Sequence, residues 1–396
     1  MNIRRGTPGS QTSLREANRA RLVDAVKIHG GLTQVELTGA TGLSAASVSN
    51  IVKELVASEV LQTSYVTRSG RRAVFVTLAR ALGLVAGVHV SARHLRVAIS
   101  DVAHTVVAEH HLPLAQDHRS DNELSRTARM IVDMLDSLDA DIEELQAVGL
   151  AIPAPINIAT GTIARAGIMR GWDAAPVADA LQEAVGKPVF VDNDCNLGAL
   201  AEQRDGAGRG HDNTVYISLS EGVGSGVIVD GRLLRGFHGS AGELGHVTID
   251  EDGPVCRCGN RGCLEMFVGG PAMIERLRTG NRGLKLHDIV TRAVAGDDRY
   301  VRAVADAGRH VGIAAANVCN IIDPERLIVG GELAQVGELL LGPMRHSLER
   351  SVFMPKESIP EVVQGQLGLR AELLGAIGLA IDQVALLREA AYASTP

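Results

Sequence analysis

Apolar positions near the start of the chain recur at helical spacing. A stretch ending at Gly30–Gly31 follows this rhythm, with Ser13 as its candidate N-cap. A second helix is expected after Thr33, where Glu36 completes a capping box, and a third after Ser44. Two short helices joined by a glycine-containing turn predict a helix-turn-helix. The residues expected on the buried face of the third helix are Val48, Ile51, Val52 and Leu55.

The pattern changes to alternation over residues 63–79, which predicts a β-hairpin with Ser69–Gly70 at its tip. A hairpin in this place is the wing of a winged helix-turn-helix. Small and polar side chains on the third helix would approach base edges, and basic side chains would reach phosphates. The candidate DNA-binding residues are Ser44, Ala45, Ala46, Ser47, Ser49, Asn50 and Lys53 on the helix and Arg71 and Arg72 on the wing.

Charge separates this region from the rest of the chain. Nine arginines and two lysines against five carboxylates give residues 1–80 a formal charge of +6, so the remainder carries −13 of the total of −7. A basic module on an acidic body is typical of a DNA-binding domain joined to a second function. The alternatives are a basic tail that aids solubility and a domain that only packs or dimerises.

Beyond residue 81 the pattern predicts an α/β body. Strands are expected in residues 84–114, with turns near Ala92–Arg93 and Ala103–His104, and an amphipathic helix in 123–138. Buried strands then alternate with helices, including a strand that runs directly into a helix over 188–208. Two such halves describe a two-lobed, actin-like or sugar-kinase-like architecture.

Cysteine content and hydropathy suggest where the protein works. There is no run of 18 apolar residues, so we expect no membrane span and no membrane partner. The first twenty residues lack the apolar core of a secretory signal. Five cysteines, three of them within eight residues, fit clustered metal ligands in a reducing compartment better than a disulfide framework. We therefore expect a cytoplasmic protein.

Three segments resemble the ROK family of bacterial sugar kinases and sugar-responsive repressors. They are VFVDNDCN at 189–196, GFHGSAGELGHVTI at 236–249 and CRCGNRGCLE at 256–265. With the winged helix in front, the chain resembles family regulators of the xylose-repressor or N-acetylglucosamine-repressor type. The resemblance implies a DNA-binding domain at 1–80 and a ROK sugar-binding domain at 81–396. Lobe one would cover about 81–192 plus the C-terminal helix, and lobe two about 193–380.

The resemblance also implies two sites in the body. One nitrogen and three thiolates form a closed set typical of structural Zn²⁺, with no position left for a catalytic water. Unrelated surface cysteines are the alternative. Carboxylates and an amide suit sugar hydroxyls, and the imidazole would serve both sites through its two nitrogens. The expected zinc ligands are His246, Cys256, Cys258 and Cys263, and the expected sugar-binding residues are Asn193, Asp194, Glu243, His246 and Glu265.

Two turns depart from the pattern of the family's kinases. His89 stands where they carry an aspartate, and Ser91–Ala92–Arg93 replaces their Gly-Gly-Thr. Ser220–Glu221 replaces a Gly-Thr pair in the second glycine-rich turn, where a carboxylate would repel phosphate. We therefore expect no kinase activity, with Asp194 as a vestigial general base and no catalytic residue.

The expected function is a sugar-responsive repressor that binds a double-stranded DNA operator as a homodimer or homotetramer. Its effector would be a sugar or a sugar phosphate. The alternatives are an active ATP-dependent sugar kinase with a DNA-binding head, and a constitutive DNA-binding protein whose sugar fold is only a scaffold.

Overall fold

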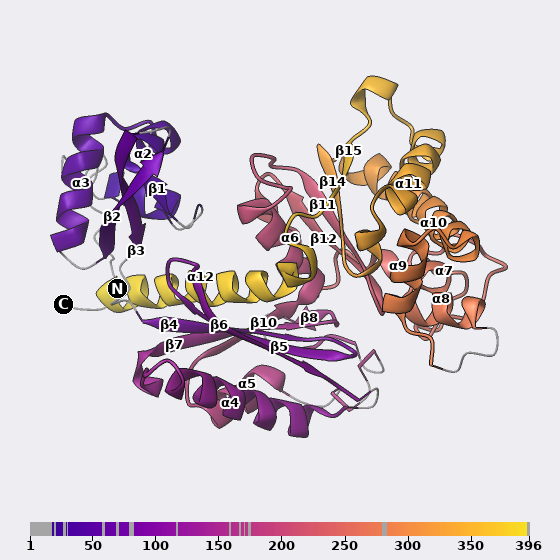
Figure 1. Ribbon diagram of the computed structural model, residues 1–396, viewed down its shortest axis with the longest axis horizontal. Helices are drawn as coiled ribbons and strands as arrows, with labels where there is room; N and C mark the ends of the chain where they lie inside the picture. Colours follow the sequence, from indigo (N-terminus) through magenta and orange to yellow (C-terminus); the bar gives the residue numbers. More distant parts are fainter. Residues whose placement is uncertain are drawn as a thin grey trace.

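The computed structural model places an N-terminal unit beside a two-lobed body (Figure 1). In this unit, helices α2 (Gln34–Thr41) and α3 (Ala45–Ala57) pack against a small sheet. Thr33 and Glu36 form the predicted capping box, because the Glu36 N–H donates to Thr33 Oγ1 at 3.3 Å and the Thr33 N–H donates to Glu36 Oε2 at 2.7 Å. The structure describes residues 18–19, 21–26, 29, 31–57, 60–68, 71–78, 83–115, 118–157, 160–165, 168–169, 171–172, 176–278 and 283–393.

The predicted third helix and hairpin are both confirmed. The Ser47 N–H donates to Ser44 Oγ at 3.1 Å, which caps the start of α3. All four residues expected on the buried face of α3 are buried. Strands β2 (Leu61–Arg68) and β3 (Arg71–Leu78) pair antiparallel, and β1 (Leu32–Thr33) joins the far side of β3. The predicted hairpin tip at Ser69–Gly70 and the predicted N-cap at Ser13 lie outside the described residues.

The body has two five-stranded sheets that repeat one topology, which confirms the predicted two-lobed α/β architecture. The lobe-one sheet has the order β10 (Val189–Asn193), β7 (Leu145–Ile152), β4 (Leu84–Val90), β5 (His94–Asp101), β6 (Val106–Pro113). The lobe-two sheet has the order β15 (Glu361–Gln364), β14 (Arg326–Gly330), β11 (Thr214–Leu219), β12 (Val223–Val229), β13 (Arg232–Leu233). The turns after β4 and after β11 therefore hold equivalent positions in the two lobes.

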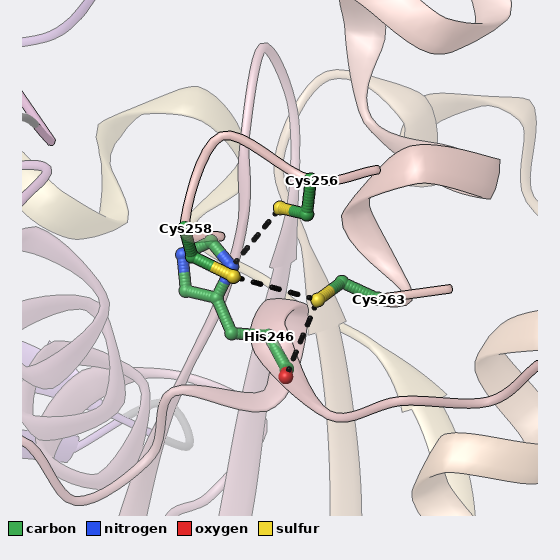
Figure 2. Close-up of side chains that lie close together, drawn as sticks. All are labelled: His246, Cys256, Cys258 and Cys263. Carbon is green, nitrogen blue, oxygen red and sulfur yellow. Dashed lines mark hydrogen bonds between the residues drawn. The ribbon is translucent and has the colours of Figure 1, made fainter. Parts of the chain in front are cut away.

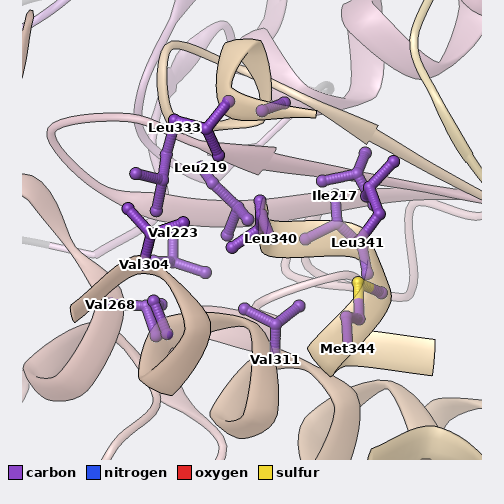
Figure 3. Close-up of a cluster of buried hydrophobic side chains, with 14 of the residues drawn as sticks. Ile217, Leu219, Val223, Val268, Val304, Val311, Leu333, Leu340, Leu341 and Met344 are labelled. Carbon is purple, nitrogen blue, oxygen red and sulfur yellow. The ribbon is translucent and has the colours of Figure 1, made fainter. Parts of the chain in front are cut away.

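Helices cover both sheets. In lobe one, α4 (Ser120–Asp136) and α5 (Val177–Val185) lie on one face of the sheet and α12 (Ala371–Ala393) on the other (Figure 1). A two-stranded ribbon, β8 (Ile156–Asn157) and β9 (Thr162–Ile163), follows β7. In lobe two, apolar side chains of β11 and β12 meet those of the long helices in one core (Figure 3). The helices of lobe two are α7 (Glu265–Val268), α8 (Gly270–Leu277), α9 (Leu286–Val294), α10 (Asp298–Ile322) and α11 (Glu338–Ser351).

Helices α12 and α6 (Asp194–Asp205) pack together where the two lobes meet. Glycines permit the close approach. A Cβ atom on Gly149 of β7 would lie 1.9 Å from the Ala376 carbonyl oxygen, and one on Gly375 would lie 2.0 Å from the Leu197 carbonyl oxygen. The other side of α6 packs on β11 and β12 of lobe two. The junction of the lobes is thus a helix–helix contact at backbone distance.

Within the part of the chain that the structure describes, none of the helices combines the length and the apolar character needed to span a bilayer.

Candidate functional site

Asn193 ends β10 and caps α6, as its place between a strand and a helix favours. Its Oδ1 accepts the N–H groups of Cys195 at 2.9 Å and Asn196 at 3.1 Å. Its Nδ2 donates to the Ala154 carbonyl at 3.2 Å. The side chain predicted to hold a sugar is therefore largely committed to the backbone, and one amide hydrogen remains for a ligand.

Asp194 is the first residue of α6 and lies beside His89 of β4. Asp194 Oδ2 is 3.7 Å from His89 Nε2, and the side chains are 15% and 12% exposed. Neither ring nitrogen of His89 has a hydrogen-bond partner among the described residues. The other Asp194 oxygen accepts the Cys195 N–H at 2.8 Å. The imidazole of His89, from lobe one, thus lies next to the Asp194 carboxylate, the expected vestigial base.

Glu243 and Glu265 complete an acidic cluster with Asp194. Burial, reinforced by the negative charges of Asp194 and Glu265, raises the pKa of Glu243 to about 7. Glu265 Oε2 accepts the Val223 N–H at 3.2 Å, and its Oε1 lies 3.0 Å from Arg257 Nε. These carboxylates are close enough to affect one another electrostatically, and Arg165 and Arg257 offset part of their charge. Carboxylates in such a cluster suit the hydroxyl hydrogens of a polyol.

The four predicted metal ligands converge, as Figure 2 shows. Their ligand atoms all lie within 4.8 Å of one another. Cys258 Sγ is 3.6 Å from Cys263 Sγ, and Cys256 Sγ is 3.6 Å from His246 Nδ1. A tetrahedral zinc ion with bonds of about 2.0–2.3 Å sets its ligands roughly 3.5–3.8 Å apart. The spacing therefore fits a metal ion of this type and is far too long for a disulfide.

The protonation chemistry and the backbone around this cluster also fit a cation. Burial raises the pKa of Cys263 to about 12, so its thiol would ionise only against a positive charge. Burial lowers the pKa of His246, which keeps its imidazole in the neutral, metal-binding form. Gly262 has φ +61°, and a Cβ there would lie 1.5 Å from the Asp250 carbonyl oxygen. Only glycine permits this turn of the metal loop.

Two arginines outside the expected zinc and sugar ligands tie the metal loop to its surroundings. Arg257, between two of the cysteines, pairs with Glu265 and donates to the Ile168 carbonyl of lobe one at 3.4 Å. Arg165 of lobe one donates to the Cys258 carbonyl at 2.7 Å. Since His246 turns Nδ1 toward the cysteines, only Nε2 remains for a ligand in the acidic cluster. The metal loop therefore contacts both lobes beside that cluster.

The two turns that depart from the kinase pattern contact each other. Arg93 follows β4 and Glu221 follows β11, and Arg93 Nε lies 3.7 Å from Glu221 Oε2. The sequence marked these two replacements in separate turns, and the structure brings them together as one ion pair between the lobes. The repeated topology explains the meeting, since equivalent turns of the two sheets face each other.

The candidate DNA-binding surface is accessible. Ser44, Ala45, Ala46, Asn50 and Lys53 are exposed, while Ser47 and Ser49 are half-buried on the same helix. On the wing, the Arg72 guanidinium lies 3.8 Å from the centre of the exposed Tyr65 ring, a pairing that the sequence did not predict. The Arg71 side chain lies outside the described residues.

Comparisons with known proteins agree with this architecture. The sequence pattern of the ROK family matches residues 85–383. The xylose repressor of Bacillus subtilis (strain 168) is 28% identical over 380 residues, which cover 94% of this chain and 97% of the relative. A solved ROK family transcriptional regulator, a homologue of the E. coli Mlc protein, has a TM-score of 0.72 at 24% identity and covers 94% of this chain and 99% of its own.

A second solved structure shares only the body. The ROK family glucokinase from Streptomyces griseus, in complex with glucose and AMPPNP, has a TM-score of 0.66 at 29% identity and covers 76% of this chain and 100% of its own. The resemblance noted in the sequence is confirmed, since the family pattern spans about three quarters of the chain: this protein belongs to the ROK family.

Proposed function

We propose that this protein is a sugar-responsive transcriptional repressor of the cytoplasm. Residues 1–80 would bind a palindromic DNA operator, and residues 81–396 would hold a sugar between the lobes and make the chain a homodimer or homotetramer. Symmetric half-sites match a symmetric protein. The observation that carries the proposal is similarity to xylose repressors over 94% of the chain, which includes most of the N-terminal unit.

The sugar would bind in the acidic cluster. Asp194, Glu243 and Glu265 supply hydroxyl acceptors, His246 offers Nε2, and Asn193 offers its remaining amide hydrogen. The neighbouring His246–cysteine cluster would hold structural Zn²⁺, which when bound ionises the thiols and fixes the loop between His246 and Glu265. A loop held in this way presents Glu265 and His246 to the ligand in one geometry.

Sugar binding would favour one angle between the lobes and so release the operator. A near-complete switch needs a preference of about 5 kcal/mol for one state. Helix α6 would carry this change to the N-terminal unit. It begins at Asp194, and Arg209 in the turn after it donates a hydrogen bond to His29 of that unit at 3.2 Å. The apolar core of that unit also joins the cluster between α12 and the lobe-one sheet.

The test is operator binding with and without sugar. Selection from random duplexes would define the operator, and fluorescence anisotropy would follow its release by D-xylose, D-glucose, N-acetyl-D-glucosamine and their phosphates. We expect one sugar to weaken binding at least about a hundredfold. If no member of the panel changes operator affinity, the chain is a constitutive DNA-binding protein.

The second candidate is an active sugar kinase with a DNA-binding head. It is favoured by Asp194 and by the related glucokinase structure with glucose and AMPPNP. Against it, His89 crowds Asp194, and Arg93 and Glu221 place paired side chains where phosphates would need backbone amides. A coupled assay of ATP turnover on the same sugars decides between the two candidates. Turnover of about 1 per second would establish the kinase.

A further inference from the structure

Asp192 is a buried carboxylate directly before the Asn193–Asp194 pair. It is 2% exposed. Its Oδ1 accepts the Asn193 N–H at 2.8 Å and Asn196 Nδ2 at 3.1 Å, both at the start of α6. Its Oδ2 accepts a hydrogen bond from Arg235 Nε at 2.9 Å and forms an ion pair with Arg235 Nη2 at 2.8 Å. Both oxygens are therefore saturated, one by the start of α6 and the other by a residue that follows β13 of lobe two.

Arg235 begins the loop that ends at Glu243. The Ala241 N–H donates to the Arg235 carbonyl at 3.1 Å, which closes the loop on its first residue. At the other end, the Gly242 carbonyl accepts the Ser225 N–H at 3.1 Å and Ser225 Oγ at 2.8 Å. The loop is thus pinned to lobe two at the residue that precedes Glu243. Its first residue is pinned to Asp192 of lobe one.

The middle of the same loop also lies against lobe one. Gly239 has φ +75°, and a Cβ there would lie 1.9 Å from the carbonyl oxygen of Ile156, at the start of β8. At Gly239 there is thus no room for a side chain between the loop and lobe one. A shift of Arg235 would reach Glu243 through this contact and through the hydrogen bond from Ala241 to Arg235.

We infer that Asp192 and Arg235 are positioning residues, which set the Asn193–Asp194 pair of one segment against Glu243 of the other. The inference deepens the proposed sugar site and rests on it. Neither side chain needs to touch the sugar. A carboxylate suits this positioning role because it has two acceptor oxygens. One oxygen fixes the start of α6 and the other fixes the loop. An apolar pair would fill the same volume but could not fix the position of the loop relative to the start of α6.

A variant that removes the guanidinium is expected to fold. Asp192 and Arg235 line a cavity of about 280 Å³ beside Val191 and Leu379, and Arg235 is 36% exposed. Water would therefore reach the carboxylate in Arg235→Gln and moderate the cost of an unpaired charge. Arg126→Gln is the matched control, since Arg126 is 42% exposed and pairs with the nearly buried Glu123 inside lobe one, away from both segments.

Amide hydrogen exchange tests the inference without any sugar. In Arg235→Gln we expect exchange about tenfold faster or more in two separate segments, 193–197 and 241–246, because the Asp192 carboxylate that accepts the Asn193 N–H and the loop that begins at residue 235 would no longer be held to each other. Arg126→Gln should leave both segments unchanged. Faster exchange confined to 241–246 would overturn the inference, since the carboxylate would then not link the two.

Calorimetric titration with D-xylose, D-glucose and N-acetyl-D-glucosamine supplies the functional arm. We expect Arg235→Gln to weaken binding about tenfold or more and Arg235→Lys to recover part of the loss, while Arg126→Gln binds as the wild type does. Equal affinity in Arg235→Gln would refute the positioning role. A wild type that binds none of the three would count against the proposed sugar site instead, and the exchange result would still decide whether Asp192 links the two segments.

Discussion

The ion pair between Arg93 and Glu221 offers the sharpest test of how the lobes respond to a ligand. It joins equivalent turns of the two sheets, so it exists only while the lobes keep the arrangement described above. That arrangement also places Asp194 close enough to raise the pKa of Glu243, and both belong to the proposed sugar site. Glu221→Gln removes one charge at nearly constant volume, and it should therefore weaken sugar binding by favouring a more open arrangement.

The magnitude follows from the geometry. Unit charges 3.7 Å apart attract by about 1 kcal/mol in water and by about 4 kcal/mol at an effective dielectric constant of about 20. The side chains are 40% and 23% exposed, so the value lies toward the aqueous end, as for measured surface pairs. We take about 1 kcal/mol, which corresponds to at most about a fivefold rise in the sugar concentration needed to release the operator.

The assay is anisotropy of a labelled operator titrated with the releasing sugar, at about 50 mM and about 500 mM salt, because screening should remove the effect at the higher concentration. Reversing the pair, with Arg93→Glu and Glu221→Arg together, should restore the wild-type midpoint. Arg126→Gln is the control, since Arg126 makes a pair of similar length and exposure with Glu123 inside lobe one. An unchanged midpoint in Glu221→Gln at low salt, or a failed reversal, would refute the reasoning.

Three further outcomes are expected. Cys258→Ser should lower bound zinc from about one per chain to near zero by elemental analysis and weaken sugar binding, whereas Cys319→Ser, at a buried cysteine outside the metal cluster, should leave both unchanged. Arg72→Ala should weaken operator binding and reduce its salt slope by about 1, with a smaller loss in Tyr65→Ala, whose ring supports the guanidinium. Asp194→Asn should weaken sugar binding without changing ATP turnover, which we expect at background in both proteins; a drop in turnover would instead identify a working base.

Local signals made most of the fold predictable. Thr33 with Glu36, and Ser44 before an apolar stripe, mark helix starts within a few residues of sequence, and the structure has both caps. The metal cluster was predictable for a related reason, because His246 and Cys263 are 17 residues apart and the ligands between them leave few ways to arrange the loop. Such signals need no knowledge of how the lobes sit together.

The contacts that the sequence did not show depend on that arrangement. Arg93 and Glu221 are 128 positions apart, and each seemed only to spoil phosphate binding until the topology brought them together. Arg235 and Asp192 are joined for the same reason. Asn193 illustrates a second limit: its residue type suits a sugar, but its place after a strand makes it a helix cap, and capping takes up its oxygen. Residue type alone cannot rank two uses of one side chain.

The proposed switch would use a helix that already lies at the junction of the lobes. Helix α6 has 12 residues, about 18 Å of helix, with Asp194 at one end and the turn that contacts the N-terminal unit at the other. It packs on the lobe-two sheet, whereas α12 packs on the lobe-one sheet, so any change of angle between the lobes must alter the contact between these helices. Gly375 of α12 lies against the Leu197 backbone of α6, so the two backbones are in direct contact there and a change of angle would have to displace one of them. Under the proposed function, a sugar that draws Asp194 and Glu243 together would act on the helix that contacts the N-terminal unit, and this would need no phosphoryl transfer.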